Sequence, residues 1–156
     1  MSSAGADFPA RFEAAQARLW HAAECGWAEG GIKPERVAAA LRAVFEFASR
    51  NPATVRILTR DALAQGPYGM ARYRELLTAA ARVLAGCRDE DAGGGELLAL
   101  TERALVGGVA TLLAERLDAG REDELPALAP EVIEFVLAPY VGAARARLLA
   151  GADMGR

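Results

Sequence analysis

Aromatic residues and histidine are scarce in this chain: aromatic side chains make up 6% of its 156 residues, and His21 is its one histidine. Hydrophobic residues nevertheless make up 53% of the sequence, and alanine and leucine supply most of them. That bias favours helices over strands. A chain of this length usually forms one domain and buries roughly two thirds of its unfolded surface. We therefore expect a single all-α domain over residues 1–156, with disordered ends at residues 1–8 and 150–156.

The chain also lacks a surplus of positive charge. Its 18 basic residues face 21 acidic ones, for a formal net charge of −3. Proteins that bind nucleic acid normally present a positive field to the phosphates. We therefore expect no binding of DNA by this chain alone.

Sequence signals for metals, cofactors and membranes are missing as well. Cys25 and Cys87 lie far apart, without CxxC or Cys/His ligand spacing, so neither a zinc site nor a disulfide framework is indicated. The glycines at 93–95 lack the lysine and the preceding strand of a phosphate-binding loop. Neither a signal peptide nor an apolar run of about 18 residues is present. We expect a cytoplasmic protein that contains no metal or cofactor and does not enter a membrane.

Prolines and glycines in the sequence predict where the helices begin and end. Six helices are expected, over about residues 9–24, 34–49, 52–64, 68–87, 96–119 and 127–149. Asn51 and Pro52 form an N-cap and first-turn pair, so the second and third helices should meet at a sharp angle. Gly120 is placed to end the fifth helix, and Pro139 should kink the sixth.

The last two predicted helices carry apolar residues almost all the way around, which indicates burial on two sides. One side serves the domain's own core, and a second copy of the chain is the simplest cover for the other. A glycine inside a helix costs about 1 kcal/mol relative to alanine, so Gly107 and Gly108 suggest that another backbone approaches there. Alternatively, they only fit a neighbouring helix of the same monomer. The predicted dimer-interface residues are Ala104, Gly107, Gly108, Thr111, Phe135 and Tyr140.

Two strings of the sequence resemble the TetR family of transcriptional regulators. KPERVAAALRAVFEFASRNPATVRILTRDAL, at residues 33–63, resembles the middle of these proteins, where one helix ends in an Asn-Pro step and an apolar-and-arginine run follows. LTERALVGGVATLLAERLDAGREDELPALAPEVIEFVLAPYVGAARA, at residues 100–146, resembles the family's last two helices. Its matching features are an acidic loop, a Leu-Ala-Pro-Glu start and an Ala-Pro-Tyr-Val-Gly step.

The resemblance implies a six-helix bundle that is the family's C-terminal regulatory domain. Its last two helices would pair with those of a second subunit in a four-helix interface, and the preceding helices would enclose a small-molecule pocket. The family's N-terminal helix-turn-helix is absent from these residues, so we expect either a trimmed fragment or a headless relative. The expected function is that of the small-molecule-sensing and dimerisation domain of a TetR-like regulator, without enzymatic activity.

A pocket is expected for a physical reason too. The Asn51-Pro52 junction keeps the second and third helices from lying parallel, so the helices that span them cannot all close-pack without a gap. We predict a site for a small apolar effector between the first, second, fourth and fifth helices. Its predicted walls are Trp20, Phe45, Leu77 and Leu105, and its predicted polar contacts are His21, Tyr73 or Thr101.

Two other functions remain open: a helical association module without a pocket, and a small enzyme that uses His21. Glu24 and Cys25 share a helix face with His21, but one helix alone does not complete a zinc site. The enzyme hypothesis requires carboxylates that converge on His21 in a cleft. Arg56, Arg60 and Asp61 could hold a polar ligand group, but arginines spaced four residues apart more often form a solvated helix face, and a salt bridge to the neighbouring helix is a further alternative.

Overall fold

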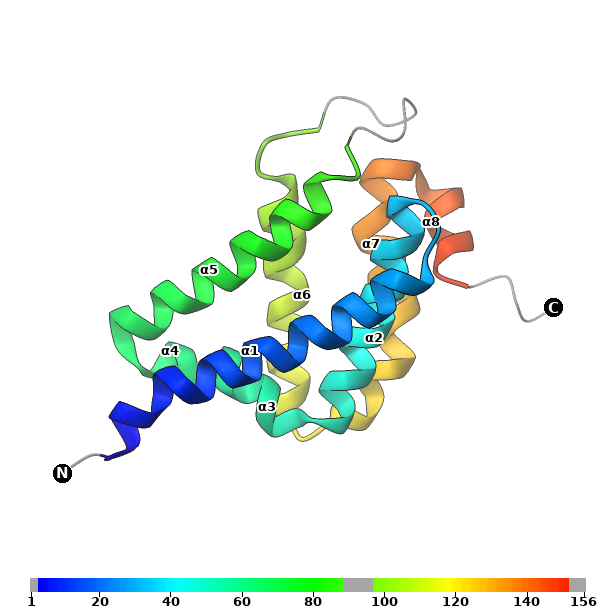
Figure 1. Ribbon diagram of the computed structural model, residues 1–156. Helices are drawn as coiled ribbons and strands as arrows, with labels where there is room; N and C mark the ends of the chain where they lie inside the picture. Colours follow the sequence, from blue (N-terminus) through cyan, green and yellow to red (C-terminus); the bar gives the residue numbers. More distant parts are fainter. Residues whose placement is uncertain (1–2, 89–96, 152–156) are drawn as a thin grey trace.

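All secondary structure in residues 3–88 and 97–151, the part of the chain that this computed structural model describes, is helical (Figure 1). The all-α prediction is thereby confirmed. In chain order the elements are α1 (Ser3–Glu29), α2 (Lys33–Arg50), α3 (Pro52–Arg56), the π-helix η1 (Ile57–Asp61), α4 (Ala62–Ala64), α5 (Gly66–Ala85), α6 (Thr101–Asp118), the 3-10 helix η2 (Glu122–Glu124), α7 (Leu125–Val141) and α8 (Ala143–Leu149). The six-helix prediction fails at the end, because the last predicted helix is two helices, α7 and α8.

Two residues at the ends that were expected to be disordered are buried. α1 begins at Ser3, and Phe8 within it is only 2% exposed, so Phe8 belongs to a packed helix. Ala150, at the other end, is 4% exposed and belongs to the core. Outside the described residues lie 1–2 and 152–156, together with residues 89–96 of the predicted acidic loop.

Glycines end two of the C-terminal helices. Gly120 follows α6 with a φ of +66°, the left-handed conformation predicted for a glycine that ends a helix. Gly142 separates α7 from α8 with a φ of +83°, which residues with a side chain rarely adopt. α7 continues through Pro139, and α8 folds back against α7 only after Gly142.

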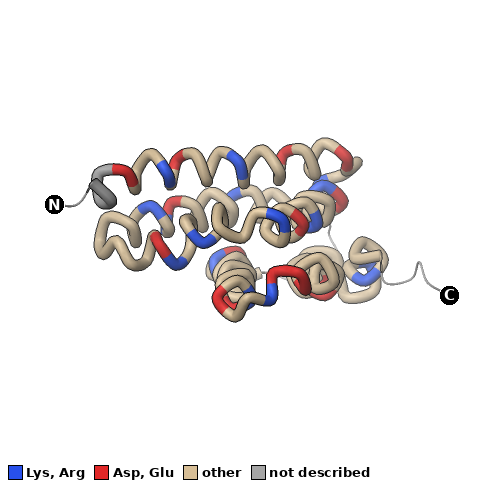
Figure 2. Tube along the Cα trace, turned by 90° about the horizontal axis from the view of Figure 1, so that it is seen from below, with Lys and Arg blue, Asp and Glu red and all other residues tan. Residues whose placement is uncertain are grey.

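α2 is the central helix, packed between α1 on one side and α7 on the other. Arg18 of α1 donates a hydrogen bond to Asn51, which follows α2. Gly26, later in α1, lies against Ala39 in the first half of α2, so the two helices run antiparallel. Their approach is close, because a Cβ at Gly26 would lie 2.5 Å from the backbone oxygen of Ala39. Figure 2 shows α1 along one side of the molecule and α6, α7 and α8 along the opposite side.

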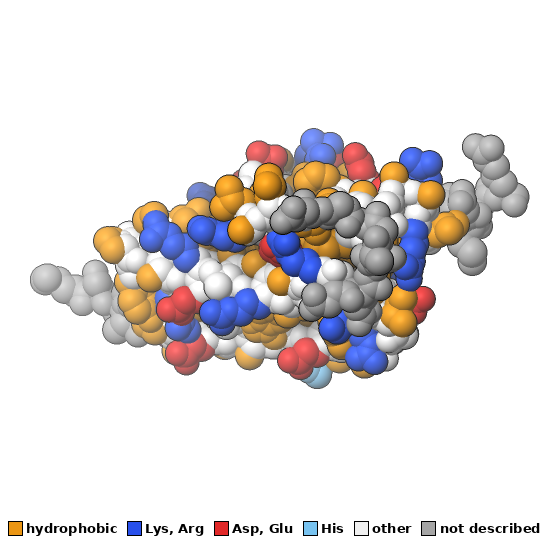
Figure 3. All heavy atoms as spheres, turned by 90° about the horizontal axis from the view of Figure 1, so that it is seen from above, with side chains coloured by type: hydrophobic (Ala, Val, Ile, Leu, Met, Phe, Trp, Pro, Cys, Tyr) orange, Lys and Arg blue, Asp and Glu red, His pale blue; other side chains and the backbone are white. Residues whose placement is uncertain are grey.

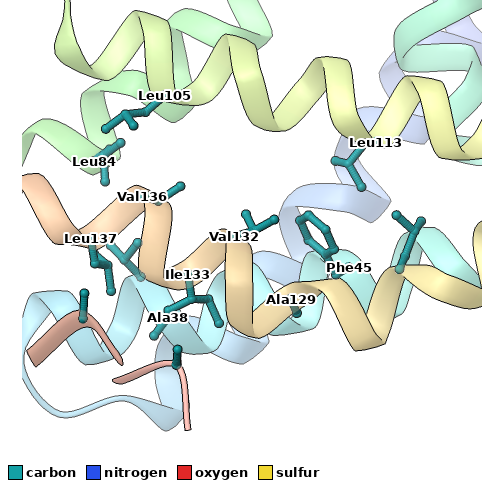
Figure 4. Close-up of a cluster of buried hydrophobic side chains, with 14 of the residues drawn as sticks. Ala38, Phe45, Leu84, Leu105, Leu113, Ala129, Val132, Ile133, Val136 and Leu137 are labelled. Carbon is teal, nitrogen blue, oxygen red and sulfur yellow. The ribbon is translucent and has the colours of Figure 1, made fainter. Parts of the chain in front are cut away.

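Buried apolar side chains form two clusters. The larger cluster joins α2, α6 and α7, with Phe45, Ile133 and Leu137 fully buried at its centre (Figure 4). The smaller cluster joins the first half of α1 to η1, α4 and α5 around Phe8 and Phe12. α5 contributes to both clusters and therefore connects the two halves of the domain.

Candidate functional site

One side of α6 is exposed and carries small or apolar residues. Ala104, Gly108 and Thr111 are exposed and Gly107 is half-buried, and their spacing of three or four residues puts them on one helix face. Leu100, just before α6, is in line with them and is 66% exposed. The Thr111 hydroxyl donates to the Gly107 carbonyl oxygen at 2.9 Å, so this polar group is satisfied within the helix.

Packing against the described residues does not explain either glycine on this face. Apart from its own helix backbone, a Cβ at Gly107 would have no described heavy atom within 4 Å, and a Cβ at Gly108 would meet only the Phe135 ring, at 3.9 Å. The described neighbours therefore leave room for alanine at both positions, although each helix glycine costs about 1 kcal/mol relative to alanine. The alternative that the glycines fit a neighbouring helix of the same monomer finds no support among these neighbours.

α7 extends the exposed side of α6. Phe135 is 56% exposed, and its ring lies next to Gly108. Together, these exposed or half-buried residues form the α6–α7 face: Leu100, Ala104, Gly107, Gly108, Thr111 and Phe135. In Figure 3, hydrophobic and charged side chains alternate along the edge of the molecule where α6 and α7 lie. An exposed apolar patch on a single chain is typical of an association surface.

Tyr140 does not lie on the α6–α7 face, which corrects one predicted interface residue. It is 2% exposed, and its hydroxyl donates to Oε1 of Glu102 at 2.9 Å. The reason is its position around α7: Tyr140 is in helical phase with the buried Ile133 and Val136, whereas Phe135 is not.

Glu102 is the centre of a buried polar network. Arg88, just after α5, binds its carboxylate through Nε to Oε1 at 2.5 Å and through Nη2 to Oε2 at 2.8 Å. The same guanidinium donates to the backbone carbonyls of Leu97 and Leu98, before α6. Tyr140 adds the bond from α7. The Arg88–Glu102–Tyr140 network thus ties the end of α5, the first turn of α6 and the second half of α7 together.

Two pKa shifts show that the network favours a charged carboxylate beside a neutral phenol. The hydrogen bonds from Arg88 lower the pKa of Glu102 to about 2, against the opposing effect of burial. Burial, followed by the bond to this carboxylate, raises the pKa of Tyr140. At neutral pH, Tyr140 therefore remains a donor and Glu102 an acceptor between α7 and α6.

The predicted ligand-binding residues are divided between the two clusters. Phe45 and Leu105 are buried in the larger cluster, whereas Trp20 and Tyr73 are half-buried against the smaller one. Burial also raises the pKa of Tyr73. The remaining three are Leu77 and Thr101, which are half-buried, and His21, which is exposed. The described structure does not gather the seven residues around one cavity.

A groove of about 430 Å³ lies elsewhere, along the surface of α2. Its lining residues are Glu29, Ala39, Arg42, Ala43, Glu46, Phe47, Arg50 and Asn51. Three of its charged residues have partners: Arg50 pairs with Glu46, and Arg42 donates to the carbonyl of Leu149. None of the predicted ligand-binding residues lines this groove.

His21 lies on the exposed side of α1, where its Nε2 is 3.7 Å from Sγ of Cys25. Within the described ranges, no three His, Cys, Asp or Glu side chains are grouped so as to hold a metal ion. The enzyme hypothesis required a cleft around His21, and an exposed position on the outer side of a helix does not provide one.

Arg56 and Arg60 bind the end of α6 and the turn that follows it. Nη2 of Arg56 donates to the Leu117 carbonyl at 2.6 Å and lies 3.8 Å from the Glu122 carboxylate. Arg60 lies 4.0 Å from the carboxylate of Asp118. Arg56 therefore makes the salt bridge that was one of the alternatives, whereas the Arg60 side chain is 68% exposed and also fits the alternative of a solvated face.

The Arg88–Glu102–Tyr140 network was not predicted from the sequence, although the sequence carries one signal for it. Glu102 is in helical phase with Leu105, Leu113 and Leu117, all of which face the core. A charged residue at a core position is rarely tolerated unless it is paired. That rule predicts a cationic partner for Glu102, although it does not say which one.

Among the described residues, no helix is long and apolar enough to cross a membrane. No protein-family model, curated protein or solved structure matches the chain. The α6–α7 face and the Arg88–Glu102–Tyr140 network are therefore the features from which a function is inferred.

Proposed function

We propose that this chain is a homodimeric regulatory domain, the small-molecule-sensing and dimerisation part of a TetR-like transcriptional regulator. The observation that carries the proposal is the α6–α7 face. There, a Cβ at Gly107 would meet no described neighbour within 4 Å, and a Cβ at Gly108 would meet only the Phe135 ring, at 3.9 Å. The resemblance of residues 33–63 and 100–146 to TetR regulators supports it, because that family pairs through its last two helices.

A second copy of the chain suits this face on physical grounds. Two-fold symmetric contacts require a surface that fits itself. The α6–α7 face combines a strip of small residues on α6 with the protruding ring of Phe135 on α7, so the strip of one copy can receive the ring of the other. Small residues also allow two helices to approach closely, which increases the dispersion contacts between them.

Sedimentation equilibrium tests the dimer. We expect the wild-type chain to associate in the micromolar range, and Gly107→Leu to weaken association strongly, because the new side chain occupies the strip and its Cβ meets no described atom of a neighbouring element. Ala17→Leu is the matched control, since Ala17 is exposed on α1. A monomeric wild type, or an unchanged dimer in Gly107→Leu, would contradict the proposal.

The sensing part of the proposal concerns the border between the two clusters. A small apolar effector would bind among the half-buried side chains there, with Trp20 on α1 and Tyr73 and Leu77 on α5 as first candidates. Because Phe45 and Leu105 are packed in the larger cluster, such a ligand must separate the clusters as it enters. Binding and helix displacement would then be one event.

Ligand binding to the folded state alone raises the thermal midpoint as ligand concentration increases. A screen of hydrophobic metabolites and drug-like cations should therefore reveal concentration-dependent shifts, and Trp20→Ala should reduce them. The matched control is Trp27→Ala, which removes the other tryptophan of α1. If no compound shifts the midpoint, the association module without a pocket is the better assignment.

The proposed domain does not read DNA. With 18 basic and 21 acidic residues, the chain offers no overall positive field to phosphates. Titration of the chain with duplex DNA at low salt is the most permissive test. Sequence-specific binding under those conditions would contradict this part of the proposal.

A further inference from the structure

The Arg88–Glu102–Tyr140 network lies between the two parts of the proposed function. Arg88 follows α5, which contributes to both clusters, whereas Glu102 and Tyr140 belong to the two helices of the α6–α7 face. We propose that the network is a rigid connection, called the strut below, that transmits displacements at the end of α5 to α7. It would thereby set the relative position of α6 and α7, and with it the geometry of the α6–α7 face. This inference rests on the proposed function, because the strut would couple the sensing half to the dimerising half.

The Arg88 end of the strut is held from several directions. Its Nε and Nη2 bind the two carboxylate oxygens of Glu102, and Nη1 and Nη2 bind the carbonyls of Leu97 and Leu98. A planar guanidinium held by four acceptor atoms cannot turn without breaking charge-assisted bonds. A shift of the backbone at Arg88 therefore either moves Glu102 with it or breaks several of these bonds together.

The Tyr140 end converts that movement into a change on the surface. The Tyr140 ring is buried in the larger cluster, and its hydroxyl is held by Glu102. Tyr140 and Phe135 are five positions apart, which places them about 140° apart around the helix axis. A rotation of α7 that follows Glu102 therefore displaces Phe135 on the opposite side, where the α6–α7 face lies.

A double-mutant cycle read by amide hydrogen exchange tests the strut. Arg88→Met keeps an unbranched apolar side chain without its donors, and Tyr140→Phe keeps the ring without its hydroxyl. We expect each variant to speed exchange in the last two turns of α7 by about tenfold. The double variant should show no more than the larger single effect, because both substitutions interrupt one connection.

Control variants separate the strut from a general loss of stability. Tyr68→Phe removes a hydroxyl from a tyrosine of α5 that is 51% exposed, and Arg72→Met removes an arginine that binds Glu13 and Glu75. Neither should change exchange in α7. Arg88→Lys retains the positive charge but cannot bind both carboxylate oxygens as the guanidinium does. Exchange in α7 should therefore be slower in Arg88→Lys than in Arg88→Met, but faster than in the wild type.

The dimer dissociation constant supplies the second readout. Tyr140→Phe should raise it by about tenfold, since a looser α7 presents the paired geometry only part of the time. Additive exchange effects, or unchanged α7 exchange in Arg88→Met, would overturn the strut even if the wild type is a dimer. Faster exchange with an unchanged dissociation constant would overturn its link to the face. A monomeric wild type would contradict the proposed function, and the exchange cycle would still decide whether the strut exists.

Discussion

The two sides of α6 differ in how far the chain itself explains their residues. On the inner side, Glu102 has hydrogen-bond partners, and Leu105 and Leu113 are buried in the larger cluster. On the outer side, Ala104 is exposed and Gly107 has open space above it. This difference between the two sides of α6 is what the proposed dimer would produce.

Gly26 in α1 and Gly107 in α6 show the same contrast between a packed and an open helix surface. A Cβ at Gly26 would lie 2.5 Å from the Ala39 carbonyl oxygen and 2.8 Å from the Cβ of Ala43, so the packing of α1 on α2 requires glycine. A Cβ at Gly107 would contact no described atom. The same residue type therefore serves an internal contact in one helix and lacks an internal reason in the other.

The largest effect is expected on the inner side, for Glu102→Leu. Loss of the carboxylate removes a charged acceptor of Arg88, which keeps its carbonyl acceptors, and the acceptor of the Tyr140 hydroxyl. Breaking one partner of a buried ion pair typically costs about 4 kcal/mol. Urea unfolding measures the loss. Glu115→Leu, at an exposed position of α6, is the matched control and should change the free energy of unfolding by less than about 0.5 kcal/mol. Equal effects of the two variants would erase the contrast between the sides.

The second largest effect is expected from acid, which should remove the stabilising contribution of Glu102 on the inner side of α6. The folded-state pKa of Glu102 is about 2, below its ordinary value of 4.5, so its contribution is fully present above pH 4.5 and is lost as the pH falls toward 2. The contribution is about 3 kcal/mol. Unfolding free energies measured across this range should fall more steeply for the wild type than for Glu102→Gln, which cannot titrate. Parallel curves would show that Glu102 is not held as described.

Gly26→Ala should destabilise the fold by about 2 kcal/mol. The added methyl group collides with the backbone of α2, and the cost of overpacking exceeds the helix propensity that alanine gains. Chemical denaturation followed by tryptophan fluorescence measures the change. A stabilised variant would mean that α1 and α2 lie farther apart than described.

Gly107→Ala should have the smallest effect and the opposite sign. Within the monomer it should add about 1 kcal/mol of stability, because alanine favours the helix and meets no described atom. Denaturation at concentrations below the dimer dissociation constant isolates this gain, and sedimentation of the same variant should show weaker pairing. If Gly107→Ala destabilises the monomer as Gly26→Ala does, the comparison between the two glycines fails.

Most of the helix pattern was predictable because prolines mark helix starts locally. Pro34 and Pro52 begin helices as expected, and the salt bridges of Arg56 to the neighbouring α6–η2 segment were among the alternatives considered. The split between α7 and α8 was missed because the apolar pattern continues across Gly142. Only the positive φ of that glycine ends the helix, and sequence periodicity does not register it.

The candidate site, too, was predictable only in part. Small residues on α6 are visible in the sequence, so the exposed strip was predictable. Phe135 and Tyr140 lie about 140° apart on one helix, so helical phase alone argued against placing both on the interface. The predicted pocket placed Phe45 and Trp20 together, but tertiary packing assigns them to different clusters. Periodicity identifies an apolar side of a helix and does not say which helix covers it.

The burial of Cys87 gives the protein a natural chemical reporter. Cys25 is exposed on α1, whereas Cys87, the residue before Arg88, is 2% exposed in the larger cluster. A thiol reagent should therefore label Cys25 promptly in the native protein and reach Cys87 only when the junction of α5, α6 and α7 opens. The rate of the second labelling step measures how often this junction opens, in the unmodified sequence and without an introduced probe.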